Sequence, residues 1–388
     1  MKIPQMFRVR QRFPSRKLAD VAGVLRVELT GCSIQPGKRI AIAVGSRGIT
    51  NLPLLVRELA GWLRSQGAEP FIVPAMGSHA GATAEGQRRL LEHLGVDAAP
   101  IVSSMDVVEL APGAFMDRQA FEADGIIVIN RIKPHTSFHG MYESGLMKMV
   151  AVGLGKHAGA LAVHALGVRG LRKVMPEVAR QVLATGKILY GVALVEDAYD
   201  ETMLVQVLPS VQILAREPEL LALARANMPF LPVKDIDVLV VDEIGKDISG
   251  TGMDTNVIGR LRIEGETEPA APRIKKIVVR DLVGESAYGI GLADVTTQRL
   301  VEKADWQITK TNVQTSGFTK RGEVPVVADT DAGALALALP AGPRVIRIQN
   351  TLHLERMLVS KPVLKSIAGR DTIEMLGPAT DWLEPLTI

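Results

Sequence analysis

Residues 38–45 read KRIAIAVG, a nearly continuous apolar run that predicts a buried β-strand ending at a glycine. A helical pattern follows in LPLLVRELAGWLRSQG (52–67), and a second strand-like run, PFIVPAMG (70–77), comes after it. The alternation continues with the predicted strands GIIVIN (125–130) and KILYGVALVED (187–197). Strands separated by helices of this length are typical of a mainly parallel sheet flanked by helices. We therefore predict an α/β fold.

A second α/β region is predicted to begin near residue 230, where a helical segment runs into a proline-bounded linker. The region opens with VKDIDVLVVDEIGKDISGTGMDTN (233–256). Later strands are expected at 274–281 and 343–350, and a helix in VTTQRLVEKADW (295–306). The chain has 388 residues, which is more than one hydrophobic core usually serves. We therefore predict two domains, 1–230 and 231–388.

The composition is that of a globular protein, with 47% hydrophobic and 22% charged residues. The net charge is +3 with both signs interspersed, so neither nucleic acid nor an anionic membrane is an expected partner. Cys32 is the only cysteine, which excludes disulfides and multi-cysteine metal sites within the chain. We find no signal peptide and no apolar run of the ~18 residues needed to span a bilayer. These features predict a soluble cytoplasmic protein, and nothing in the sequence indicates its oligomeric state.

Polar residues follow three of the predicted strands at their carboxyl ends. GSRGITN carries Arg47, MGSHAGAT carries His79, and RIKPHTSFHG carries His135 and His139. In a parallel sheet these loops open on the same edge, where ligands bind. Arg47 precedes a helix start, so it could bind a carboxylate or phosphate, or be a surface arginine beside an ordinary cap.

Two histidines and one lysine could carry chemistry. His79 and His135 come from separate strand ends and could act as acid and base on opposite faces of a substrate, because an imidazole titrates near neutral pH. A single histidine in a loop can equally be structural. Lys148 lies in the apolar run LMKMVAVGL; its amine could reach solvent, or be partly buried and serve for covalent attachment.

His157 and His164 are seven residues apart and would share one face of a helix. Their spacing does not match a zinc-hydrolase motif, whereas nickel also accepts imidazole ligands. The glycine-rich stretch GKDISGTGMD (245–254) matches no phosphate-binding motif and is expected to contribute Lys246 or Asp254 to a cleft.

In chain order, Arg47, GSH at His79, PH at His135, SGLMK at Lys148 and a histidine sixteen residues later at His164 resemble the nickel-pincer lactate racemase family. The resemblance implies a nickel-pincer nucleotide cofactor joined to Lys148, with His164 as the nickel ligand. His79 and His135 would be the acid/base pair, and Arg47 would bind the substrate carboxylate or the cofactor phosphate.

By the same resemblance, the chain would be a racemase or epimerase of a small 2-hydroxy acid, working by reversible hydride transfer to the cofactor. Residues 1–230 would bind the cofactor and 231–388 would close the cleft between the domains, with Lys246 binding substrate. Cofactor-biosynthesis enzymes would be its partners. The loop Val44–Ser46 lacks the family's acidic residue before Arg47, MYE (141–143) lengthens the loop before Lys148, and the family's Gln/Lys substrate pair is not found. These departures favour a 2-hydroxy acid other than lactate.

Two other functions remain open on this sequence. One is a nucleotide- or carboxylate-binding protein that uses the same fold without turnover. The other is a metal-dependent hydrolase or lyase that uses His135, His139 and a carboxylate.

Overall fold

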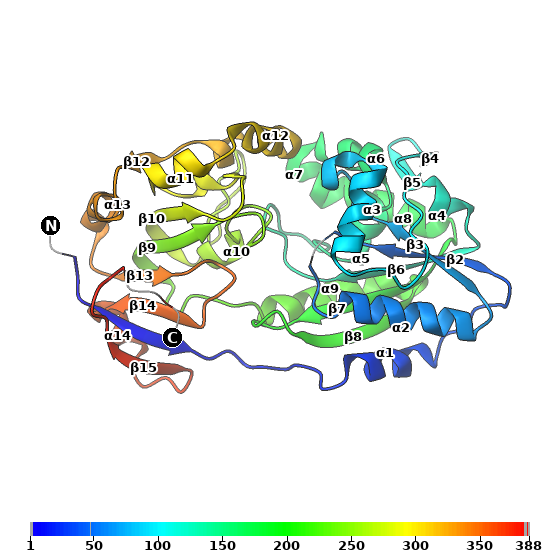
Figure 1. Ribbon diagram of the computed structural model, residues 1–388, viewed down its shortest axis with the longest axis horizontal. Coiled ribbons are helices and arrows are strands. Elements are labelled where there is room, and N and C mark those ends of the chain that lie inside the picture. The colour runs from blue at the N-terminus through cyan, green and yellow to red at the C-terminus, as the bar shows by residue number, and fades with distance from the viewer. Residues whose placement is uncertain (1–2, 47, 384–385, 387–388) are drawn as a thin grey trace. The chain divides into compact units, whose positions relative to one another are not determined.

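The computed structural model describes residues 3–46, 48–383 and 386, and the chain forms two compact units (Figure 1). Unit 2 is Pro14–Met228, and unit 1 combines Met1–Phe13 with Pro229–Ile388. The predicted domain 1–230 therefore differs from unit 2 at its start. The first residues belong to unit 1 because strand β1 (Met6–Gln11) pairs with strands from the end of the chain. Closure of a cleft by 231–388 stays a prediction.

Unit 2 is built on a five-stranded sheet with the order β3-β2-β6-β7-β8. The strands are β2 (Arg39–Val44), β3 (Glu69–Pro74), β6 (Gly125–Arg131), β7 (Ile188–Glu196) and β8 (Thr202–Pro209). The first four are parallel, and β8 is antiparallel to β7. The predicted mixed α/β class with a mainly parallel sheet is confirmed.

Helices and turns cover both faces of this sheet. The helices are α1 (Val21–Leu29), α2 (Leu52–Ser65), α3 (Ala84–His93), α4 (Arg118–Glu122), α5 (Leu146–Lys148), α6 (Lys156–His164), α7 (Gly167–Arg169), α8 (Met175–Ala184) and α9 (Ser210–Ala226). The unit also contains the 3₁₀ helix η1 (Ala80–Ala82), the π-helices η2 (Met149–Gly153) and η3 (Gly170–Val174), and the hairpin of β4 (Val107–Ala111) and β5 (Ala114–Asp117). Among the described residues, no single helix is long and apolar enough to span a membrane. The helical segments Leu146–Gly153 and Lys156–His164 have the required length and composition only when taken together, and a bend of 107° separates them.

The two faces of the sheet differ in side-chain size. Ile40 and Ile42 of β2 are fully buried in one apolar core together with residues of α1 and α2. Ala41 lies on the other face, because side chains alternate along a strand. On that face helices come very close: a Cβ on Gly191 of β7 would lie 2.6 Å from Cδ1 of Leu146 in α5. Small strand residues such as Gly191 thus allow the segment that carries Lys148 to pack closely against the sheet.

Unit 1 contains an eight-stranded sheet with the order β12-β11-β10-β9-β13-β14-β1-β15. Its other strands are β9 (Asp235–Ile244), β10 (Arg273–Leu282), β11 (Val295–Thr297), β12 (Val326–Ala328), β13 (Val345–Ile348), β14 (Arg356–Ser360) and β15 (Ile373–Pro378). Its helices and turns are α10 (Thr255–Ile258), η4 (Ile290–Leu292), α11 (Gln298–Lys303), α12 (Trp306–Ser316), η5 (Thr319–Gly322), α13 (Asp331–Ala338), η6 (Leu339–Ala341) and α14 (Lys361–Ile367). Strands β9 to β13 pair in parallel, whereas β14, β1 and β15 add antiparallel strands at one edge.

The helix predicted over 295–306 is wrong at its start. Residues 295–297 form strand β11, because the β-branched sequence Val-Thr-Thr favours a strand. The helix then begins at Gln298, where the Thr297 side chain accepts a hydrogen bond from the Leu300 N–H.

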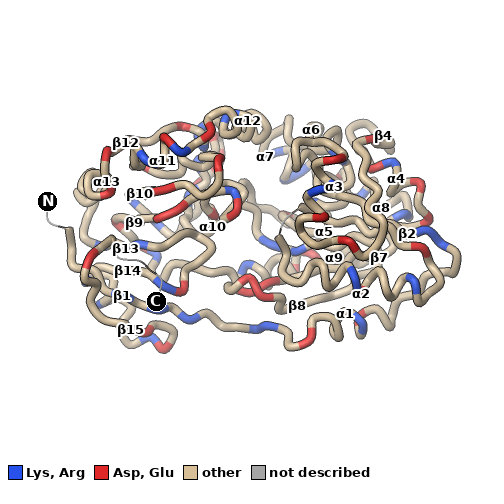
Figure 2. The backbone as a smooth tube through the Cα atoms, in the orientation of Figure 1, with Lys and Arg blue, Asp and Glu red and all other residues tan. Residues whose placement is uncertain are grey.

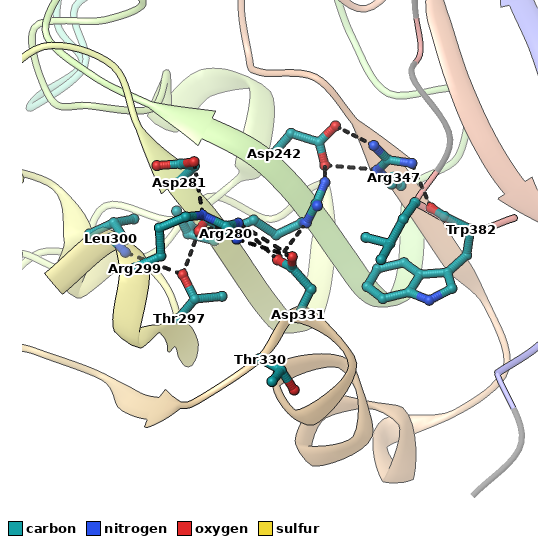
Figure 3. A network of polar contacts seen from close by, with 12 residues as sticks. Asp242, Arg280, Asp281, Thr297, Arg299, Leu300, Thr330, Asp331, Arg347 and Trp382 are labelled. Atoms are coloured by element: carbon teal, nitrogen blue, oxygen red, sulfur yellow. Dashed lines mark hydrogen bonds and ion pairs between the residues drawn. The ribbon is translucent and has the colours of Figure 1, made fainter. Parts of the chain in front are cut away.

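A network of ion pairs crosses the strands of unit 1 (Figure 3). Arg280 of β10 contacts Asp242 at 2.7 Å and Asp331 at 2.9 Å. Arg347 of β13 contacts Asp242 through two nitrogens, each at 2.8 Å, and Arg299 of α11 contacts Asp331 at 3.1 Å. Burial raises the pKa of Asp331, but the two arginines outweigh it and the net pKa is lowered. Each of these charges has a partner, so the network holds strands and helices together. Elsewhere acidic and basic residues are interspersed in both units (Figure 2).

Candidate functional site

The loops that follow β2 and β3 meet at the carboxyl edge of the unit 2 sheet. The Ser46 hydroxyl and His79 Nδ1 are in hydrogen-bond contact, so each loop positions the other. A Cβ on Gly45 would lie 3.7 Å from Oδ1 of Asn130, at the end of β6, and 3.4 Å from Cε of Met149. The ends of β2 and β6 and the residue after Lys148 are therefore neighbours. Arg47 lies outside the described residues.

The His79 side chain is exposed, and hydrogen bonds fix its backbone. Its N–H donates to the Met76 carbonyl at 3.1 Å. The buried amide of Gln87 donates to the Gly77 carbonyl at 2.8 Å and to the His79 carbonyl at 3.4 Å. An exposed ring on a fixed main chain suits proton exchange with a small molecule.

The loop that carries His135 is anchored by Glu143, whose carboxylate is fully buried. It accepts hydrogen bonds from the His135 N–H at 2.6 Å and the Gly140 N–H at 3.0 Å, and pairs with Arg225 at 2.7 Å. His139 Nδ1 lies 3.3 Å from the same carboxylate. Glu143 belongs to the MYE segment (141–143) that lengthens the loop before Lys148. The added segment therefore supplies the carboxylate that fixes the His135 backbone. Sequence reasoning missed this role.

The neighbouring Tyr142 shows why a proline is tolerated inside helix α9. Pro218 has no N–H to donate to the Leu214 carbonyl four residues earlier. The Tyr142 hydroxyl donates to that carbonyl instead, at 2.9 Å. The break in the helix thereby becomes an attachment point for the loop.

His135 and Lys148 are in direct contact, with His135 Nε2 and Lys148 Nζ 2.7 Å apart. The Ser137 N–H donates to His135 Nδ1 at 3.0 Å, so that nitrogen carries no proton. We assign the ring proton of neutral His135 to Nε2 on this pattern. The Nε2–H then donates to Lys148 Nζ, and an ammonium group cannot accept a hydrogen bond. With this tautomer the contact favours the uncharged form of the Lys148 amine.

The short helix α5, which ends at Lys148, is capped by a buried carboxyl from helix α9. The Met147 N–H donates to Glu217 Oε2 at 2.9 Å. Glu217 is fully buried, and its Oε1 makes no hydrogen bond within the described part of the chain. Burial raises the pKa of Glu217 to about 8. No motif identified Glu217, because its role depends on a contact 70 residues away in sequence.

His164 ends helix α6 and is half-buried. Burial lowers its pKa to about 4, and the neighbouring charge of Lys148 acts in the same direction. Burial is the larger cause, so the direction holds for either charge of Lys148. His164 is therefore neutral at pH 7 and offers a nitrogen lone pair to a metal ion.

Lys156, the first residue of α6, is fully buried. Its Nζ donates to the Pro74 carbonyl at 2.7 Å and to Gln87 Oε1 at 3.1 Å, and forms an ion pair with buried Asp117 at 3.1 Å. Burial lowers the pKa of Lys156 and raises that of Asp117. Because Gln87 also holds the His79 loop, Lys156 links that loop to the segment between Lys148 and His164.

Two further predicted residues, His157 and Lys246, have surroundings of their own. His157 is exposed on α6. Lys246 belongs to unit 1, where it hydrogen-bonds Asn312 and lies 5.8 Å from the centre of the Tyr288 ring. Within the residues that the structure describes, no three His, Cys, Asp or Glu side chains form a metal-binding group.

Comparisons with known proteins connect the chain to solved folds. No protein-family model matches it, and no curated protein sequence matches it. A lactate racemase apoprotein from Thermoanaerobacterium thermosaccharolyticum is similar in structure, with a TM-score of 0.51 and 13% identity over 89% of this chain and 98% of that one. A protein from Thermotoga maritima is similar with a TM-score of 0.53 and 13% identity, over 83% and 87% of the two chains. The chain thus shares the fold of these proteins.

Proposed function

We propose that the chain is a racemase or epimerase of a small 2-hydroxy acid that uses a nickel-pincer nucleotide. The observation that carries the proposal is the 2.7 Å contact between His135 Nε2 and Lys148 Nζ, which places an amine beside an imidazole. The likeness of fold to a lactate racemase apoprotein supports the reaction class.

The residues present fit such a cofactor. An uncharged Lys148 amine is the form that attaches covalently to an acyl-type group. His164 is neutral at pH 7 and can give one ligand to a metal whose other donors come from the cofactor. When bound, the cofactor would supply the acceptor for the hydride of the substrate α-carbon.

Proton transfer is assigned to two histidines, His79 and His135. The Ser46 hydroxyl can donate to or accept from His79 Nδ1, so His79 can carry its proton on either ring nitrogen. Once Lys148 is acylated its nitrogen is no longer a base, and His135 Nε2 is released to exchange a proton with the substrate hydroxyl. Inversion exchanges the two faces of the substrate, which is why one base on each face is needed. Arg47 and Lys246 are proposed to bind the substrate carboxylate.

Coexpression with cofactor-biosynthesis enzymes tests the proposal. Intact-mass and metal analysis should show one cofactor adduct and one nickel per chain, and single enantiomers of 2-hydroxy acids should racemise. Lys148→Ala should lose the adduct, and His164→Ala should keep the adduct but lose nickel. His79→Gln should keep both while turnover falls by roughly 10²–10⁴-fold. Lys17→Ala, at an exposed ion pair, is the matched control and should behave as wild type.

Two results would redirect the assignment. An adduct that survives Lys148→Ala refutes the tether. A loaded, nickel-containing protein that racemises no 2-hydroxy acid indicates a binding protein on the same fold.

A further inference from the structure

The pairing of His135 with Lys148 has a chemical consequence for the chain before any cofactor is attached. An amine is nucleophilic only when it is uncharged, and an ordinary lysine with a pKa near 10.4 is uncharged in roughly one molecule in a few thousand at pH 7. The tautomer that we assign to His135 from its Ser137 contact places an N–H against the Lys148 nitrogen, which favours the uncharged amine. The side chain is half-buried, so small molecules can still reach it.

We propose that Lys148 is a carbonyl-reactive amine that condenses with small aldehydes and 2-oxo acids, with His135 as the acid of the reaction. This activity belongs to the chain without cofactor and does not rest on the function proposed above. It would place the chain among proteins that form imines through a lysine.

The hydrogen bond itself prepares the step. The lone pair that accepts the His135 Nε2–H is the one that attacks, so attack breaks the hydrogen bond and frees the Nε2–H for the carbonyl oxygen. A C–N bond forms from the lone pair of Lys148 while the C=O π pair moves to oxygen. That oxygen takes the Nε2 proton, and the adduct nitrogen returns a proton to His135. Loss of water from the carbinolamine gives the imine, with no change of oxidation state.

Two buried carboxyl groups hold His135 and Lys148 in position. Glu143 fixes the His135 backbone and Glu217 caps the helix that ends at Lys148. The two carboxyls belong to different elements, so the 2.7 Å contact is set by the fold and not by local sequence. Lys156 provides a contrast inside the same segment, because it is fully buried among three oxygen acceptors. We expect it to be unreactive.

Reductive trapping tests the proposal. The purified full chain, made without cofactor-biosynthesis enzymes, is treated at pH 7 with glyoxylate and cyanoborohydride, and the carboxymethyl groups are located by peptide mapping. One group per chain is expected at Lys148 first, at least about 100-fold faster than at the exposed Lys17 in the same sample. Lys148→Met should abolish this fast label, whereas Lys17→Met should leave it unchanged.

Variants of His135 test its part. His135→Leu should slow the label at Lys148 by about 100-fold, as loss of a general acid does. Because this variant could fail to fold, the ratio of Lys148 to Lys17 labelling in the wild-type chain decides the reactivity of the amine independently. Labels distributed by exposure alone would overturn the proposal, and a wild-type rate in folded His135→Leu would overturn the role of His135. Either result leaves the cofactor-loading experiment unaffected.

Discussion

Glu217→Gln should make unit 2 more stable at alkaline pH than the wild-type protein. The wild-type carboxyl is fully buried, its Oε2 accepts a hydrogen bond from the Met147 N–H, and its Oε1 has no hydrogen-bond partner within the described residues. Glutamine has the same shape and keeps a carbonyl oxygen for the Met147 N–H, but it cannot ionise. The substitution therefore removes the cost of a buried negative charge and little else.

The size of the effect follows from the pKa of Glu217, which burial raises from 4.5 to about 8. Between these values the folded chain keeps a proton that the unfolded chain has released. The free energy of unfolding therefore falls as pH rises through this window. At about 1.4 kcal/mol per pH unit, the full loss is on the order of 4–5 kcal/mol at pH 8. Glu217→Gln should escape this loss.

Urea unfolding at several pH values between 5 and 8 measures the difference, with hydrogen exchange of unit 2 peptides as the signal. The stabilities of wild type and variant should be similar at pH 5, and the gap should widen steadily toward pH 8. Glu219→Gln is the matched control, because Glu219 is exposed on the same helix, and its profile should run parallel to wild type. Parallel profiles for Glu217→Gln would refute the assignment of a protonated buried carboxyl.

Two further predictions concern packing around the same segment. Lys156→Met should destabilise unit 2 by about 3–5 kcal/mol in urea unfolding, because it leaves the Asp117 carboxyl buried without its partner. The double variant Lys156→Met with Asp117→Asn should recover much of this loss. A double variant as unstable as the single one would contradict the pairing. Gly145→Ala should lower the free energy of unfolding by about 1–3 kcal/mol, since its Cβ would lie 2.4 Å from Glu217 Oε1. The control Gly61→Ala has open space around the new Cβ and should be neutral or slightly stabilising. Equal thermal stability of the two variants would show that the Gly145 contact relaxes without cost.

Local patterns predicted the fold of unit 2 well, because they record burial along one element at a time. The run at 38–45 is buried on both faces of its strand, and the parallel neighbours at 70–77 and 125–130 carry the same signal. Once these strands are parallel, the loops at Ser46, His79 and His135 must lie at one edge. The sequence thus contained the arrangement of these loops, although not the hydrogen bonds between them.

Residues whose role depends on distant partners could not be predicted in this way. Glu143 and Glu217 look like ordinary charged residues in helical or loop segments, yet both are fully buried. Their partners include Arg225, 82 residues from Glu143, and Met147, 70 residues from Glu217. The same limit applies to β1, whose pairing with β14 and β15 joins segments from the two ends of the chain.

Two lysines in one apolar segment show why burial alone does not identify a reactive amine. Lys148 and Lys156 both follow glycine-containing apolar sequence, and both could have been the nucleophile on the argument that burial disfavours an ammonium. Lys156 is the more buried, but its nitrogen donates to two oxygen acceptors and forms an ion pair with the Asp117 carboxylate. Lys148 is less buried, and its nitrogen contacts His135 Nε2, where the assigned tautomer places an N–H that favours a lone pair on the amine. The donor or acceptor character of the neighbouring atom, more than its depth in the protein, therefore decides which lysine can form a covalent bond.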